Sequence, residues 1–95
     1  MGARRSQAAI TIREGFARRL KAARELAGYV TQEDAAKALG VQSERYRRWE
    51  RAETEPAIDK LVEIGKVFKV SVDLLIHGNV HEPFRDREAP RKKFS

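Results

Sequence analysis

The chain has 95 residues, 36% of them charged and 41% hydrophobic, a balance that fits one small globular domain and excludes a wholly disordered chain. Its 20 Lys and Arg residues outnumber 14 Asp and Glu residues, so the formal net charge is +6 and a polyanion, above all a nucleic acid, is the first partner to consider. The lack of cysteine excludes disulfides, zinc fingers and thiol catalysis, and no apolar run reaches the roughly 18 residues of a membrane span.

The excess positive charge is concentrated at the two ends. Residues 1–11 hold Arg4 and Arg5 and no acidic residue, and residues 79–95 hold five basic against three acidic residues. We therefore predict a flexible basic N-terminal arm at 1–11, a folded domain at 12–78 and a basic C-terminal tail at 79–95. The tail is either a solvated segment or a segment that orders on a partner.

Apolar periodicity predicts five helices and no strand, the first of them over residues 12–27. Thr11 and Glu14 have the spacing of a capping box at its start, and Gly28 ends it. The second helix is short, from 32 to 39. Gly40 stops it, because glycine readily adopts the positive φ of a tight turn.

The third predicted helix, about 43–52, has a narrow apolar stripe of Tyr46, Trp49 and Ala52. Its other face carries Glu44, Arg45, Arg47, Arg48 and Arg51. Pro56 then breaks the chain.

The fourth predicted helix runs from about 57 to 68, and Ser71 caps a short last helix over 72–76. The inner stripe predicted for the fourth helix is Ile58, Leu61, Val62, Gly65 and Phe68.

Residues 32–51 have the pattern that a helix-turn-helix requires. Small Ala36 stands where the two helices cross, Gly40 makes the turn four residues later, and Val41, Tyr46 and Trp49 hold the second helix to the domain. The opposite face then points outward, and an α-helix fits the major groove of B-DNA. Arginine side chains on that face suit guanine edges and phosphates. A merely solvated basic face is the alternative.

The sequence over 12–78 resembles the Cro/repressor-type helix-turn-helix family, also called the Xre family. The resemblance rests on TQEDAA at 31–36, LGV at 39–41, WER at 49–51 and VSVDLL at 70–75. It implies an all-α, compact five-helix bundle of the lambda-repressor-like type. It also implies binding to double-stranded DNA, usually as a homodimer on a palindromic operator.

Carried over residue by residue, the resemblance assigns DNA contacts to Gln32, Gln42, Ser43, Glu44, Arg45, Arg47, Arg48 and Arg51. Gln32 matches a phosphate-binding glutamine, and Arg51 matches a backbone-contacting position. The residues at 42–44 match the start of the recognition helix, and Arg48 matches a base-reading position one turn along. Arg45 and Arg47 lie on the same side of that helix.

The sequence departs from the family pattern at four places. Ala52 stands where a glycine usually ends the recognition helix, and Gln42 stands where Ser or Thr usually caps it, so that Ser43 could take over the cap. Ala57 replaces the usual Ser, and the turn at 28–30 is one residue longer than the commonest form. These departures leave the helix ends and the register of base contacts open.

Two acidic residues of the third helix have competing interpretations. The resemblance implies that Glu50 pairs with Arg24 in a nearly buried ion pair joining the first and third helices. Glu44 either accepts a hydrogen bond from a cytosine amino group or pairs with Arg48 at i+4.

No catalytic or metal site is predicted. His77 and His81 are four residues apart, but Gly78 and Asn79 between them break a helix and no third ligand is apparent. The sequence contains neither a phosphate-binding glycine loop nor a nucleophile motif. We expect no enzyme activity, cofactor or metal.

The leading hypothesis is a sequence-specific transcriptional regulator that binds double-stranded DNA, a repressor and homodimer, in the cytoplasm of a prokaryote and associated with its nucleoid. The first alternative is an antitoxin or another protein-interaction module that uses the same domain and binds its partner through the C-terminal tail. A second alternative is a factor that touches DNA weakly while bridging other proteins.

Overall fold

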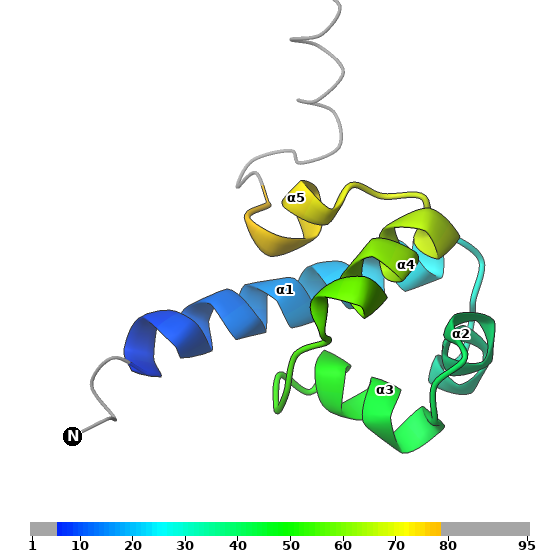
Figure 1. The fold of residues 1–95 in the computed structure, drawn as a ribbon, viewed down its shortest axis with the longest axis horizontal. Helices are drawn as coiled ribbons and strands as arrows, with labels where there is room; N and C mark the ends of the chain where they lie inside the picture. The colour runs from blue at the N-terminus through cyan, green and yellow to red at the C-terminus, as the bar shows by residue number, and fades with distance from the viewer. Residues whose placement is uncertain (1–5, 79–95) are drawn as a thin grey trace, which may run out of the picture.

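The computed structural model describes the backbone of residues 6–78 and the side chains of residues 11–78. This part of the chain forms five helices and no strand: α1 Ser6–Leu26, α2 Gln32–Leu39, α3 Ser43–Glu50, α4 Ile58–Phe68 and α5 Val72–Ile76. The long α1 is central, with α5 on one side of it and α3 on the other, while α2 packs against α3 and α4 (Figure 1). The predicted all-α five-helix bundle is confirmed.

Local capping explains where α2 and α5 begin. The Thr31 side chain caps α2 by accepting a hydrogen bond from the Asp34 amide at 3.0 Å, and the Ser71 side chain caps α5 by accepting from the Leu74 amide at 2.9 Å. At the end of α2, Gly40 has the left-handed φ of 70° that the sequence predicts, and its amide donates to the carbonyls of Ala36 and Lys37. These boundaries follow from residues within one turn of each helix end.

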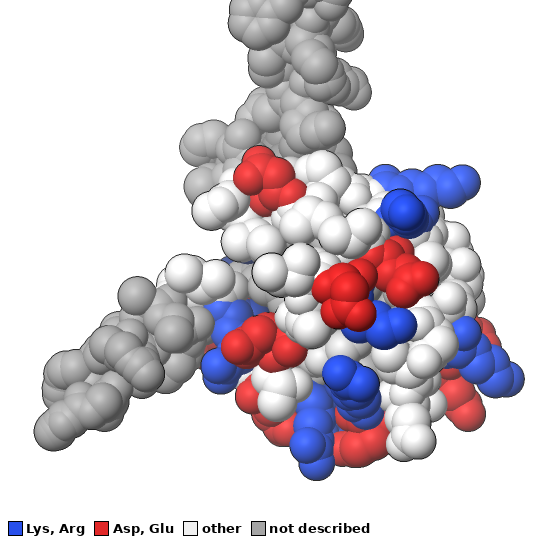
Figure 2. Space-filling view, viewed as in Figure 1, with Lys and Arg blue, Asp and Glu red and all other residues white. Residues whose placement is uncertain are grey.

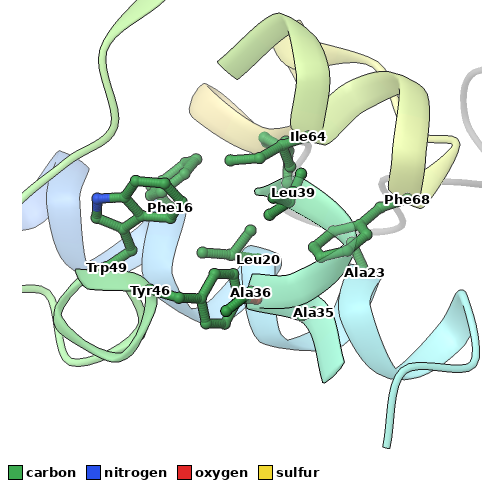
Figure 3. Close-up of a cluster of buried hydrophobic side chains, with 11 residues drawn as sticks. Phe16, Leu20, Ala23, Ala35, Ala36, Leu39, Tyr46, Trp49, Ile64 and Phe68 are labelled. Atoms are coloured by element: carbon green, nitrogen blue, oxygen red, sulfur yellow. The ribbon is translucent and has the colours of Figure 1, made fainter. Parts of the chain in front are cut away.

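The core lies between α1, α2, α3 and α4 (Figure 3). Trp49, Tyr46, Leu20, Ile64 and Leu75 are its largest fully buried side chains. The two aromatic side chains of α3 extend toward Leu20 and Phe16 of α1. Leu75 of α5 also belongs to this cluster. Because each of the five described helices contributes side chains to it, each helix is held in place mainly by its neighbours.

The start of α1 differs from the prediction. The helix begins at Ser6, so Thr11 lies inside it and the predicted capping box with Glu14 is wrong. Residues 6–10 contain neither Gly nor Pro, and nothing in them stops the helix from extending toward the N-terminus. Residues 6–11 of the predicted arm therefore belong to α1, and residues 1–5 lie outside the described residues.

The end of α3 also differs from the prediction. The helix ends at Glu50, and Ala52 leaves it with a φ of 62°. That left-handed conformation is one that glycine adopts without cost and alanine does not. Ser43 is the first residue of the helix rather than its cap, because Gln42 occupies the cap position and its side chain makes no capping hydrogen bond.

The inner face of α4 is rotated relative to the prediction. Ile58 and Val62 are 76% and 47% exposed, whereas Ile64, absent from the predicted stripe, is fully buried with Phe68. Lys60 joins α4 to the end of α2, since its Nζ donates to the Leu39 carbonyl at 3.1 Å. Two adjacent apolar stripes fit the sequence of α4, and packing against α2 selects one of them.

Arg19 attaches α5 to α1. Its Nε donates to the Leu75 carbonyl at 2.8 Å and its Nη2 to the Ile76 carbonyl at 2.7 Å, so a side chain of α1 satisfies carbonyls that end α5. Gly78 lies directly over this guanidinium, where an added Cβ would come within 2.5 Å of Nη1. The sequence carries no local signal for this contact, since the partners are more than fifty residues apart.

Candidate nucleic-acid interface

The α2–turn–α3 segment is built for close helix packing. Ala35 and Ala36 are buried, so the backbones of α2 and α3 approach without large side chains between them. After Gly40, the Val41 amide donates to the Ala36 carbonyl at 3.0 Å and closes the turn. The sequence prediction of a helix-turn-helix over 32–51 is confirmed in its geometry.

Tyr46 and Trp49 anchor α3 to the core. Their relative exposures are 0% and 1%, and their rings meet edge to face with centroids 5.6 Å apart. Since these rings occupy the inner face of the helix, the arginines lie on the remaining surface. Side-chain exposure is 40% for Arg47 and 52% for Arg48.

One carboxylate lies among these arginines. Glu44 is 3.4 Å from Nη2 of Arg47, 3.5 Å from Nε of Arg48 and 3.2 Å from Nη2 of Arg51. The pairing of Glu44 with Arg48 at i+4, one of its two predicted roles, is therefore present. The hydrogen bond from Arg51, together with the charges of all three arginines, lowers the pKa of Glu44 below its ordinary value.

The remaining arginine of α3, Arg45, has a different environment. Its side chain is exposed, and its guanidinium carbon lies 5.9 Å from the centre of the Trp49 ring. That distance is within the range of a cation–π contact, which holds the guanidinium beside the helix. Arg45 is thus oriented by an aromatic ring, whereas the other three are oriented by a carboxylate.

Acidic residues limit the basic surface at the end of α3. Arg51 contacts Glu53 at 3.0 Å as well as Glu44. The hydrogen bond to Glu53, and to a smaller extent the one to Glu44, raises the pKa of Arg51. Further along the loop, Glu55 pairs with Arg13 of α1 at 2.8 Å. Acidic and basic side chains accordingly alternate along the lower edge of the molecule, where α3 lies (Figure 2). The electrostatic surface is mixed rather than uniformly positive.

Behind this surface, Glu50 connects three helices. Arg24 of α1 donates to it at 2.8 Å, Tyr46 of α3 at 2.6 Å and Gln32 of α2 at 2.9 Å. Arg24 also donates to the carbonyls of Tyr29 and Val30 in the turn after α1. The ion pair between Arg24 and Glu50 that the resemblance implied is present, and the two hydrogen bonds from Gln32 and Tyr46 are additional.

Burial and hydrogen bonding act in opposite directions on this buried group. Burial alone would raise the pKa of Glu50, but the hydrogen bonds from Arg24, Tyr46 and Gln32 outweigh it and the pKa is lowered. For Arg24, burial would lower the pKa, and the contacts with Glu50 reverse the direction. Burial, followed by the hydrogen bond to Glu50, raises the pKa of Tyr46, so its hydroxyl stays protonated as a donor. The network therefore holds one negative and one positive charge.

The residues predicted at the start of the two motif helices have distinct surroundings. Gln42 is exposed at the beginning of α3, and Ser43 is partly buried in its first turn. Gln32, predicted to bind phosphate, begins α2 and uses an amide N–H to hold Glu50. The hydrogen bond from Tyr46 to Glu50 could have been predicted from the sequence, because these two residues are spaced i, i+4 on one helix.

Only one of the two histidines considered as metal ligands lies in the part of the chain that the structure describes. His77 is exposed, with its Nε2 3.8 Å from Asp73, and His81 lies outside the described residues. Among residues 11–78, no group of three or more His, Cys, Asp or Glu side chains could hold a metal ion. None of the helices in the described region is long and apolar enough to cross a lipid bilayer.

An apolar groove of about 280 Å³ opens beside the loop that follows α3. Its lining comes from α1, this loop, α4 and α5, and consists of Ile12, Arg13, Phe16, Glu55, Pro56, Leu61 and Ile76. Ile12 is itself 55% exposed. Glu55 of this loop also lines a second hollow together with Glu44, Arg45 and Arg48 of α3, so the two surfaces adjoin at the loop.

Comparisons with known proteins agree with this geometry. The chain is 37% identical over 59 residues to the HTH-type transcriptional regulator ImmR of Bacillus subtilis (strain 168), an alignment that covers 62% of the chain and 46% of that regulator. The chain thus spans about half the length of this curated relative. No solved structure gives a significant match. The family model described as helix-turn-helix matches residues 20–75, which is more than half of the chain, and the protein therefore belongs to the helix-turn-helix family.

Proposed function

We propose that this protein binds double-stranded DNA in a sequence-specific manner and regulates transcription, acting as a repressor, with α3 inserted in the major groove. The observation that carries the proposal is the division of α3 into two faces. Tyr46 and Trp49 are buried, and the three arginines of α3, followed by Arg51 just after the helix, remain on the outer side. A helix of this kind, held from behind by Glu50, is rigid enough to present its side chains to base edges.

We assign the individual contacts by their place on this surface. Arg48 and the residues at 42–44 read bases, since they lie on the outward side of α3 and at its start. Arg45 and Arg47 flank them and contact bases or the nearest phosphates. Arg51 and Gln32 contact the DNA backbone, Gln32 through the second N–H of the amide that already holds Glu50.

We further propose that the protein acts as a homodimer on an inverted repeat. Two copies would place their α3 helices roughly 34 Å apart, one turn of DNA. The surface that supports this assignment is the apolar groove beside the loop after α3, together with exposed Ile58 and Val62 of α4. Burying these side chains against a second copy removes apolar area from water while leaving α3 uncovered.

The proposed place of action is the prokaryotic cytoplasm, at the nucleoid, because that is where a bacterial regulator meets its operator. The alternative function, an antitoxin or another protein-interaction module, depends on a partner bound through residues 79–95. Those residues lie outside the described residues, and no contact in the described part of the chain favours this alternative over DNA binding.

Selection of bound duplexes from a random library, with purified protein at stated salt, tests the proposal. We expect enrichment of one motif arranged as an inverted repeat, and loss of enrichment when Arg45, Arg47 and Arg48 are all changed to Ala. The matched control changes Lys21, Lys66 and Lys69 to Ala, which removes the same charge from outside α2 and α3. A library that stays random with the unmodified protein, or equal loss in both triple variants, would overturn the proposal.

A further inference from the structure

Glu44 is the acidic side chain of the outward face of α3, and it lies within ion-pair distance of three arginines. The distances to Arg47, Arg48 and Arg51 are 3.4, 3.5 and 3.2 Å. In the free protein, one carboxylate thus compensates guanidinium groups that the proposed function assigns to DNA. Arg51 has a second acidic partner in Glu53, whereas the ion pairs described for Arg47 and Arg48 involve Glu44 alone.

DNA binding must change this arrangement. When the arginines turn toward phosphates and base edges, Glu44 loses its partners and faces a negatively charged double helix. An unpaired carboxylate in that position opposes binding unless a donor replaces the guanidinium groups. In the major groove the exocyclic amino groups of cytosine and adenine are the donors, and a Glu side chain typically accepts from the N4 amino group of cytosine.

We propose, on the basis of the DNA-binding function above, that Glu44 determines specificity by admitting α3 only to sequences that place a cytosine amino group beneath it. The arginines supply attraction to any DNA, since phosphate contacts carry no sequence information. At a sequence that leaves its carboxylate unpaired, Glu44 offsets this attraction. At the correct base pair, the hydrogen bond from cytosine pairs the carboxylate and the attraction of the arginines is no longer opposed. The three ion pairs and the cytosine contact are therefore successive states of one side chain.

Glu53 provides a matched control for this inference. It is an acidic side chain with the same exposure as Glu44, 51% against 52%, and it also pairs with Arg51. However, Glu53 lies in the loop beyond α3, and its described partner is Arg51 alone. Changing either residue to Ala alters the net charge equally, and only Glu44→Ala removes the carboxylate from the outward face of the helix.

The test compares the unmodified protein, Glu44→Ala and Glu53→Ala on three kinds of duplex at one salt concentration. These are the duplex enriched by selection, a scrambled duplex, and the enriched duplex with each cytosine in turn replaced by thymine, whose O4 is an acceptor. Circular dichroism verifies that both variants are folded, which we expect because the pairs they remove are exposed.

We expect the unmodified protein to disfavour one cytosine-to-thymine replacement by about 5-fold to 100-fold, and Glu44→Ala to bind both versions within about twofold. Glu44→Ala should also bind the scrambled duplex more tightly, while Glu53→Ala leaves the ratio between enriched and scrambled duplexes unchanged. Equal ratios in all three proteins would overturn the role of Glu44 and leave the DNA-binding proposal intact. An unmodified protein that binds no duplex would overturn both.

Discussion

Arg24 and Glu50 form a buried ion pair between α1 and α3, with Nε and Oε2 2.8 Å apart and side-chain exposures of only 5% and 4%. Among described residues, no buried side-chain nitrogen or oxygen lacks a hydrogen-bond partner, so this pair is fully satisfied. A satisfied buried pair fixes the position of α3 relative to α1, because any shift would leave a charge unpaired in a poorly solvated site.

Replacing Arg24 with Met should therefore destabilise the protein by about 3–5 kcal/mol, since Glu50 would keep its charge without its cationic partner. The measurement is the free energy of unfolding in urea. The control is Arg13→Met, which breaks an exposed pair with Glu55 and should cost less than about 1 kcal/mol. Similar losses in both variants would contradict a special role for the buried pair.

The protonation of Glu50 should make the free energy of unfolding depend on pH in the acidic range. Hydrogen bonds and the charge of Arg24 overcome the effect of burial and hold the pKa of Glu50 below its ordinary value of 4.5. A carboxyl with a lower pKa in the folded state stabilises the fold above its unfolded pKa and loses this contribution as the pH falls through the folded value.

The measurement of this acid effect is urea unfolding between about pH 7 and about pH 3, where we expect the free energy of unfolding to fall below pH 4.5. Glu50→Gln has no proton to gain at this position, so its free energy of unfolding should change less over the same range. An identical acid loss in both proteins would assign the effect to other carboxyl groups.

Replacing Ala52 with glycine should stabilise the protein. Its φ of 62° is left-handed, a conformation that costs an L-residue roughly 1–2 kcal/mol and glycine almost nothing. Part of this gain is offset by the greater freedom of glycine in the unfolded chain, so we expect a net increase of about 0.5–1 kcal/mol in chemical denaturation. The control Ala38→Gly, at an exposed position inside α2, should lower stability by about 1 kcal/mol. Changes of the same sign in both variants would refute the argument.

Arg48 and Arg51 should respond differently to replacement with Ala. Loss of a base-reading side chain relaxes discrimination at one base pair, and loss of a phosphate contact weakens binding to all sequences. We therefore expect Arg48→Ala to reduce the affinity ratio between the correct and the wrong base pair at one position by about 5-fold to 100-fold. Arg51→Ala should lower the slope of log affinity against log salt concentration by about one. Titrations of single-base variants of the enriched duplex at several salt concentrations measure both effects. If Arg48→Ala ranks all sequences as the unmodified protein does, Arg48 does not read bases.

Val62 should matter for assembly and not for folding. It is 47% exposed on α4, so Val62→Glu leaves the core intact while introducing a charge into the proposed dimer surface. Light scattering should show a monomer, and affinity for the inverted repeat should fall by about 100-fold because the two half-sites are no longer bound together. The matched control, Val30→Glu, changes a valine that is 80% exposed in the turn before α2. Monomers in both cases, or dimers in both, would exclude this surface.

Several features of this protein follow from its sequence alone. Gly40 ends α2, Thr31 and Ser71 cap α2 and α5, and the spacing of Tyr46 and Trp49 predicts the buried face of α3. Each depends on hydrogen bonds or periodicity within a few residues. The helix-turn-helix, and with it the outward arginine surface, could therefore be predicted from local pattern.

Contacts between distant segments decided the rest. Neighbouring helices, and not the apolar pattern of α4, determine that Ile64 is buried and Val62 exposed. The same holds for the hydrogen bonds from Arg19 to the carbonyls of α5 and from Gln32 to Glu50, because in each case the donor and the acceptor belong to different helices. A sequence specifies which faces of a helix can be buried, but the burial of one face and the pairing of a charge depend on what lies opposite, and that is determined only when the helices pack together.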